Sequence, residues 1–286
     1  MRQKDPLGRE DDIADGQRLA LPKNAQSPFN HTNLGTNALG GLAFQKSPIP
    51  LELVGVREMH HELFDKLAPL ATHAERAVQF MDYMTVHFYM RHLERAGFSA
   101  GGRTDRHKID YQRILRGWMF NPDGREAAVL KGWVASRFGL LPRHHNGPLD
   151  DYEGEPFQKF LKMQSAGLYN TNALESQLDV LYAYSQYELA RTHPDHRHWL
   201  LYRGFNGLGE QDIRLRHGKR RAVVLLNNLN SFSEFRERAD EFGDTIMEVQ
   251  VPLPKIVFFH GLLPGAFKGE GEVMVIGGLY EVRLSS

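Results

Sequence analysis

The sequence of 286 residues contains no cysteine. This absence excludes disulfides, thiolate ligands for iron–sulfur clusters and thiol catalysis by this chain, and it fits a reducing compartment. An excess of charge is also missing, because 35 Lys and Arg residues match 35 Asp and Glu residues. A dominant electrostatic surface for nucleic acid or for a membrane is therefore not indicated. No apolar run approaches the roughly 18 residues that a membrane span needs, and no secretory signal is visible. We expect a cytoplasmic protein without a membrane span.

Several familiar site motifs are absent or incomplete. The sequence has no phosphate-binding G-x-x-x-x-G-K-[ST] loop, no strand-linked G-x-G-x-x-G and no G-x-S-x-G nucleophile elbow. Its 14 histidines invite a metal hypothesis, but the run at 60–62 lacks the second histidine of a zinc-protease helix. The cluster at 193–198 contains Arg197, which would oppose a dication, and the pair at 144–145 falls in an expected loop. We interpret these histidines as surface or hydrogen-bonding residues rather than metal ligands.

The N-terminal two thirds of the chain carry helical patterns. Residues 1–26 are polar without periodicity and predict a loose arm, whereas residues 29–41 predict an ordered, turn-rich loop. Asn172 resembles the N-cap of the last helix, which would stop before Pro194, and Gly97 resembles a C-cap glycine. The expected helices lie at 51–67, 74–96, 108–120, 125–138 and 156–167, with a last one that carries Leu174 and Leu189.

From about residue 196 the pattern changes to alternation and to short apolar runs, which predict strands. A short helix at about 233–241 interrupts them. This order favours an α+β fold, in which a mainly helical region at 27–195 packs on a β-rich region at 196–286. We expect the two regions to form one continuous globular unit. The expected strands lie at 198–204, 222–226, 246–251, 255–259, 273–276 and 279–284.

Three polar features stand at the ends of expected strands. Arg203 ends the first strand, and its planar guanidinium suits a phosphate or a carboxylate. Ser231 and Ser233 follow the most apolar strand and alternate onto one face. Glu270 and Glu272 flank a single glycine, so in an extended chain both carboxylates point into one space although like charges repel. Each feature alone has a simpler explanation: an ion pair for the arginine, a helix N-cap at Ser233 and a solvated turn at the glutamates.

Together, the arginine, the Ser-x-Ser and the Glu-x-Glu stand in an order that resembles the arginine–serine–glutamate class of mono-ADP-ribosyltransferases. The stretches at 29–34, 80–84 and 275–280 extend the likeness. Within the class, the whole chain is similar to the dinitrogenase-reductase ADP-ribosyltransferase family, whose members switch nitrogenase off. The resemblance implies an ADP-ribosyltransferase-type core of two small sheets. It also implies NAD as co-substrate, with no metal required.

The resemblance further implies which residues bind NAD. Arg203 would contact the phosphate and ribose side, and the backbone of Gly204 would hydrogen-bond the nicotinamide carboxamide. Ser231 would hold the catalytic glutamate in register, and Ser233 would also lie on the cofactor side. Phe232 stands where the class usually has threonine, a departure that leaves both serines in place.

The two glutamates would have separate roles. Breaking the nicotinamide–ribose bond develops an oxocarbenium-like cation, which Glu272 can stabilise while it hydrogen-bonds the ribose 2′-hydroxyl. Glu270, a mark of arginine-directed members, would bind the acceptor guanidinium and help to remove its proton. The apolar, glycine-rich loop at 262–269 would meet the protein substrate. Either Phe235 or Phe242 would stack on nicotinamide.

These features predict an arginine-specific enzyme that transfers ADP-ribose from NAD to dinitrogenase reductase. The reaction would release nicotinamide and reversibly inactivate nitrogenase. By resemblance, a PII-type signalling protein is the expected regulatory partner. Two alternatives stay open. One is a transferase for another protein's arginine, or an NAD glycohydrolase, because the triad reads NAD and not the acceptor. The other is a non-catalytic NAD-sensing module, against which the intact Arg203, Ser231 and Glu272 argue.

Overall fold

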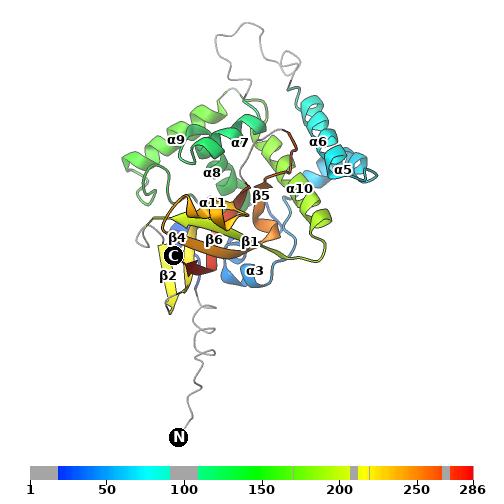
Figure 1. The fold of residues 1–286 in the computed structure, drawn as a ribbon. Helices are drawn as coiled ribbons and strands as arrows, with labels where there is room; N and C mark the ends of the chain where they lie inside the picture. The colour runs from blue at the N-terminus through cyan, green and yellow to red at the C-terminus, as the bar shows by residue number, and fades with distance from the viewer. Residues whose placement is uncertain are drawn as a thin grey trace.

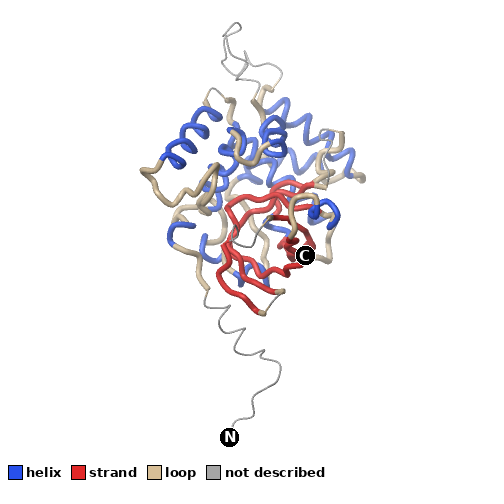
Figure 2. The backbone as a smooth tube through the Cα atoms, turned by 60° about the vertical axis from the view of Figure 1, so that its left-hand side comes forward, coloured by secondary structure: helices blue, strands red, loops and turns tan. Residues whose placement is uncertain are grey.

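The computed structural model describes residues 19–90, 109–169, 171–206, 212–218, 220–265 and 271–285. Figure 1 shows most of the helices gathered on one side of a β-sheet, and Figure 2 shows the same division from another angle. The expected α+β class is confirmed. The helices are α2 (Thr36–Leu39), α3 (Leu42–Lys46), α4 (Val56–Met59), α5 (His61–Leu67), α6 (His73–His87), α7 (Tyr111–Phe120), α8 (Arg125–Phe138), α9 (Glu155–Leu168), α10 (Leu174–Thr192) and α11 (Arg236–Asp240), with the 3-10 helices η1 (Lys23–Ala25) and η5 (Leu253–Lys255). The strands are β1 (His198–Phe205), β2 (Asp212–His217), β3 (Arg221–Ser233), β4 (Thr245–Pro252), β5 (Ile256–Phe259) and β6 (Glu272–Ser285).

The strands form one hydrogen-bonded sheet in the order β2-β3-β1-β4-β6-β5, and the pairings are antiparallel. A further pairing joins β3 to β6, so that β3, β1, β4 and β6 close into a ring. Few residues make the contacts that close the ring. Tyr202 pairs with Ser233 between β1 and β3, and only the first residues of β4 pair with β6. The expectation of two small sheets is wrong in this detail, because these contacts at the strand ends join all six strands into one sheet.

Strands β3 and β6 pair along most of their length, with Ser233 opposite Glu272 at one end. The sequence predicts two strands in place of β6, because Gly277 and Gly278 interrupt its apolar pattern. In the structure the pairing shifts at this point, and a Cβ on Gly277 would lie 1.7 Å from the carbonyl oxygen of Asn227. Gly278 has a φ of 112°. The glycines therefore let β6 pass a bulge in β3 instead of ending the strand.

The helices of the middle region follow the sequence closely, whereas the earlier ones do not. Helices α7, α8 and α9 begin and end within three residues of their predicted bounds. The helix predicted at 51–67 is instead the pair α4 and α5, and it begins only after Gly55, which has a left-handed φ of 82°. Helix α6 ends at His87, and Tyr89 soon after it has a positive φ of 49° that is incompatible with a continuing helix. The predicted C-cap residue Gly97 lies outside the described residues.

Two further local predictions are wrong. Asn172 does not cap α10, because its side-chain amide donates to the carbonyl oxygen of Phe88. The helix begins after Ala173, which has a left-handed φ of 48° and no capping hydrogen bond. Strand β2 is missing from the predicted set, because only Ile213 and Leu215 carry its apolar alternation among charged neighbours.

The predicted order at 29–41 is confirmed, although residues 36–39 of this segment form the short helix α2. Asn30 donates through its side-chain amide to the carbonyl oxygen of Leu34 and to Oγ1 of Thr36, at 2.9 and 3.1 Å. The backbone N–H of Leu279 in β6 donates to the carbonyl oxygen of Gly40 at 2.7 Å. The loop is therefore fixed both by its own side chains and by the sheet.

One hydrophobic core runs through both regions, from Leu21 to Leu284 in β6. Leu21 and Ala25 are buried, so the expected loose arm does not include the packed residues from Leu19 onward. The rest of that arm, residues 1–18, lies outside the described residues. Among the helices that the structure describes, none is long and apolar enough to cross a membrane.

Candidate active site

The paired ends of β3 and β6 bring the predicted serine and glutamate together. Ser231 and Ser233 lie within β3 rather than after it, and Ser233 is directly opposite Glu272 in the ladder. Because residues two apart share a face of a strand, both serines lie on the side of the Glu272 carboxylate. The hydroxyl of Ser231 donates to Oε1 of Glu272 at 2.6 Å. Phe232 between the serines is buried, as expected for the opposite face.

Arg203 reaches the same cluster from β1. Its Nη1 donates to the carbonyl oxygen of Ser231 at 2.7 Å. Burial lowers the pKa of the Arg203 guanidinium, and the negative charge of Glu272 opposes that shift. The three residues of the predicted triad, separated by 28 and 41 positions along the chain, therefore form one contact group.

A fourth residue, Trp118 of α7, completes the cluster and is not among the predicted site residues. Its indole Nε1–H lies 2.9 Å from Oγ of Ser231 and 3.0 Å from Oε1 of Glu272, and it donates to both. Trp118 is buried, and a buried indole N–H needs an acceptor. The sequence predicts the helix that carries this tryptophan, but nothing in the local sequence identifies its partners.

The electrostatics of Glu272 reflect a partly buried carboxylate held by donors. Burial raises the pKa of its carboxyl group above the usual range. The hydrogen bonds from Ser231 and Trp118 and the charge of Arg203 oppose this rise, because they favour the ionised form. Such a group can stabilise a cation that develops beside it, since the protein dipoles around it are already oriented.

Comparison with known proteins places the chain in a family. The model of the family described as dinitrogenase reductase ADP-ribosyltransferase (DRAT) matches residues 29–284. The chain belongs to this family. It is 39% identical over 261 residues to the NAD(+)–dinitrogen-reductase ADP-D-ribosyltransferase of Rhodospirillum rubrum, a match that covers 90% of this chain and 94% of that protein. No solved structure matches.

The two remaining NAD-side residues predicted for this ADP-ribosyltransferase have structural contacts of their own. A Cβ on Gly204 would lie 1.8 Å from the carbonyl oxygen of Ala239, so the glycine lets α11 rest directly on β1. Ser233 accepts a hydrogen bond from the backbone N–H of Phe235 at 3.0 Å. It is not the N-cap of α11, because the cap residue is Phe235 itself. The NAD-binding roles of Gly204 and Ser233 remain predictions.

The acceptor side of the transferase is only partly described. Glu270 and the second half of the glycine-rich loop before it, residues 266–269, lie outside the described residues. Of the two candidate aromatics, Phe235 packs beside Glu272, since a Cβ on the neighbouring Gly271 would lie 2.8 Å from its ring. Phe235 and Phe242 are 52% and 67% exposed, so both rings are open to a ligand. The contact with Gly271 places Phe235 next to the start of β6, where Glu272 lies.

Three of the histidines that raised a metal hypothesis make hydrogen bonds or ring contacts. His60 lies 2.9 Å from the hydroxyl of Tyr83, and His193 packs on the ring of Trp199 at 4.9 Å. Nδ1 of His145 lies 3.3 Å from Nζ of Lys131. Within the described ranges, no group of three or more His, Asp or Glu residues is arranged to hold a metal ion.

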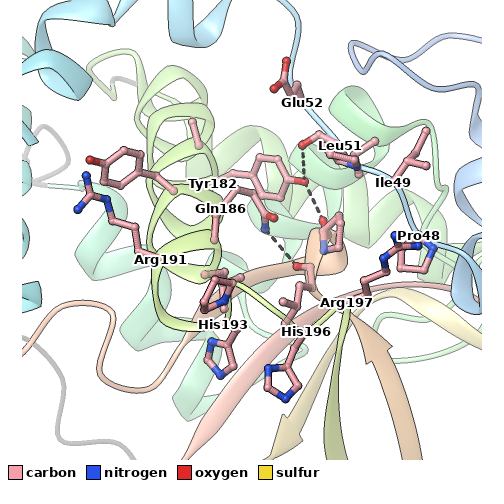
Figure 3. A pocket seen from close by; sticks show the side chains of 18 of the residues that line it. Pro48, Ile49, Leu51, Glu52, Tyr182, Gln186, Arg191, His193, His196 and Arg197 are labelled. Atoms are coloured by element: carbon pink, nitrogen blue, oxygen red, sulfur yellow. Dashed lines mark hydrogen bonds between the residues drawn. The ribbon is translucent and has the colours of Figure 1, made fainter. Parts of the chain in front are cut away.

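A separate cavity of about 660 Å³ lies between the segment at 48–57, α10 and η5 (Figure 3). The hydroxyl of Tyr182 lies at its wall, 2.7 Å from the carbonyl oxygen of Pro254, and Gln186 donates to the carbonyl oxygen of Ile256 at 2.8 Å. None of the predicted site residues lines this cavity. It is therefore distinct from the cluster around Glu272.

Proposed function

We propose that this chain transfers ADP-ribose from NAD to an arginine side chain of dinitrogenase reductase, releases nicotinamide and so reversibly inactivates nitrogenase. The observation that carries the proposal is the contact group of Arg203, Ser231 and Glu272 in a chain of this family. The name of the Rhodospirillum rubrum relative supports the choice of protein substrate. A cytoplasmic location and a PII-type regulatory partner rest on the sequence and its resemblance, and they remain predictions.

In the proposed reaction, the bond between ribose C1′ and nicotinamide breaks, and the neutral nicotinamide leaves with the electron pair. Glu272 stabilises the positive charge that develops on the ribose, and Arg203 binds the phosphate and ribose side of NAD. A guanidinium nitrogen of the acceptor then forms the new bond to C1′, and its proton passes to Glu270. Ser231 holds Glu272 in the geometry that this step requires.

The direct test uses NAD that carries a labelled adenylate, incubated with the protein in the presence and absence of dinitrogenase reductase. We expect label on an arginine of the reductase and a matching release of nicotinamide. Nicotinamide release without label transfer would indicate an NAD glycohydrolase. NAD binding with neither product would indicate a non-catalytic NAD-sensing module, and label on another protein alone would indicate a different acceptor.

A variant of the acceptor-side carboxylate refines this test. Glu270→Gln keeps the size of the side chain but removes its charge and its basicity. We expect loss of transfer to arginine with some nicotinamide release retained, because Glu270 acts on the acceptor and Glu272 on NAD. Equal loss of both activities would contradict this division between the two carboxylates.

A further inference from the structure

Trp118 makes an unusual pair of contacts for a core tryptophan. Its Nε1–H is shared between Oγ of Ser231 and Oε1 of Glu272, while Ser231 also donates to that same Oε1. The three polar atoms therefore form a closed triangle. Both donors act on Oε1, and Oε2 of Glu272 accepts no hydrogen bond from any residue that the structure describes. The two donors thus hold the carboxylate of Glu272 by its Oε1 oxygen.

Trp133 of α8 is a tryptophan of the same protein whose indole N–H bonds a residue outside the site, and it serves as a comparison for Trp118. It is also buried, and its Nε1–H donates to Oδ1 of Asp179 at 2.7 Å. Asp179 is already paired with Arg137, and neither residue is part of the site. The indole N–H of Trp133 donates to a carboxylate that already belongs to an ion pair outside the site. The indole N–H of Trp118 donates to Glu272, the carboxylate proposed to act on NAD.

A buried cation, Lys131 of α8, lies over the ring of Trp118. Nζ of Lys131 lies 5.9 Å from the centre of the Trp118 ring and is held by Oδ1 of Asp123 at 2.8 Å and the carbonyl oxygen of His144 at 3.1 Å. Lys131 is 2% exposed. A cation over an aromatic face withdraws electron density from the ring, which strengthens the indole N–H as a donor. The helical region thereby orients Trp118 and also favours its hydrogen bond to Glu272.

We propose that Trp118 is a positioning residue of the reaction, which holds Glu272 through Oε1 so that Oε2 faces the ribose 2′-hydroxyl of NAD. This inference rests on the proposed function, because it assigns Glu272 to the NAD side. It makes the helical region part of the active site. Trp118 acts through Glu272 and does not itself contact the reacting atoms.

The test compares Trp118→Phe with the matched variant Trp133→Phe, which removes an indole N–H from the neighbouring helix. For Trp118→Phe we expect kcat for nicotinamide release to fall about 10- to 100-fold, the effect of one hydrogen bond to a charged group. KM for NAD should change less than about threefold, and the acidic limb of the pH profile should move to higher pH, because the ionised carboxylate loses a donor. Trp133→Phe should lower thermal stability and leave the pH profile of the folded enzyme unchanged.

Two outcomes separate this inference from the proposed function. If wild-type protein turns over NAD and folded Trp118→Phe has the wild-type kcat and pH profile, the positioning role is overturned and the function stands. If the wild-type protein shows no NAD chemistry, NMR titration of the labelled Glu272 carboxyl group still tests the contact. A titration midpoint at higher pH in Trp118→Phe than in wild type supports it, and an unchanged midpoint overturns it.

Discussion

At the scale of single residues, the burial of Glu272 explains the polar groups around it. A desolvated carboxylate prefers to be neutral, and burial accordingly raises its pKa. The hydroxyl of Ser231, the indole of Trp118 and the charge of Arg203 each favour the ionised form. The site therefore keeps a carboxylate that is available as an anion in surroundings where an isolated one would take up a proton.

Removing the serine donor tests this balance. Ser231→Ala deletes the hydrogen bond at 2.6 Å and leaves Oε1 of Glu272 with the indole alone. We expect activity at neutral pH to fall about 10- to 100-fold, since hydrogen bonds to charged groups contribute about 1.5–3 kcal/mol. The acidic limb of the pH–rate profile should move to higher pH, because protonated Glu272 is favoured. Steady-state kinetics across pH would check both, with the surface variant Ser136→Ala as control; a profile unchanged in Ser231→Ala would contradict the account.

The sequence predicted part of this cluster. Arg203, Ser231 and Glu272 follow an order that can be matched along the chain, and the ladder of β3 and β6 brings the last two together. Trp118 could not be found in this way, because its acceptors lie 113 and 154 positions away. A donor that reaches a carboxylate across such a distance depends on how two regions pack, and no local pattern records that packing.

At the scale of secondary-structure elements, His73 joins the start of α6 to two distant segments. Its Nδ1 lies 2.8 Å from Oε2 of Glu188 in α10, and its Nε2 lies 2.8 Å from the carbonyl oxygen of Gly261. Both partners are acceptors, so only the doubly protonated imidazolium can donate to both. The hydrogen bond to Glu188 raises the pKa of His73 above its usual value. The contact fixes the beginning of the loop that leads to Glu270.

The sign of the pH dependence follows from this raised pKa. The stabilisation is fully present below the unfolded-state pKa of histidine and is lost as pH rises through the higher folded-state value. We expect His73→Gln to lower the free energy of unfolding by about 1 kcal/mol at pH 6 and by less at pH 9. Hydrogen exchange at residues 260–265, corrected for intrinsic rates, should lose protection with rising pH in wild type but not in His73→Gln. Exposed His61→Gln is the control, and pH-independent protection of wild type would contradict the prediction.

The elements themselves were predictable to different degrees. Helices α7 and α8 were predicted closely, because apolar spacing and the turn-forming residues Asn121-Pro122-Asp123-Gly124 between them are local signals. Strand β6 was predicted as two pieces, since the role of Gly277 depends on its close contact with Asn227 in another strand. The start of α10 was predicted wrongly, because Asn172 bonds the distant Phe88 instead of its own helix.

At the scale of the whole molecule, Lys255 is a cation enclosed by the fold. It is fully buried in η5, donates to the carbonyl oxygen of Gly277 at 2.9 Å and lies 4.5 Å from the centre of the Tyr280 ring. Burial lowers the pKa of Lys255 to about 7. Among the described residues no carboxylate pairs with it, so the folded state holds this charge at a cost in free energy.

This cost predicts how stability depends on pH. Between about pH 7 and pH 10 the unfolded lysine keeps its proton while the folded one releases it, so the contribution of Lys255 to stability improves as pH rises. We expect Lys255→Met to raise the free energy of unfolding at pH 7 by about 1–3 kcal/mol and to weaken the rise toward pH 9. Denaturant unfolding at both pH values would measure this, with exposed Lys66→Met as control. Destabilisation by Lys255→Met at pH 7 would show that its hydrogen bond and ring contacts outweigh the burial cost.

The most direct measurement for the whole account compares Glu272→Gln with Glu281→Gln in the labelled-NAD assay. Glu281 lies on the same strand but pairs with Arg221 away from the site. We expect folded Glu272→Gln to lose both label transfer and nicotinamide release, because the cation that develops on the ribose loses its stabilising charge, and Glu281→Gln to retain both. Transfer at the wild-type rate by Glu272→Gln would contradict the assignment of this carboxylate and the site built around it.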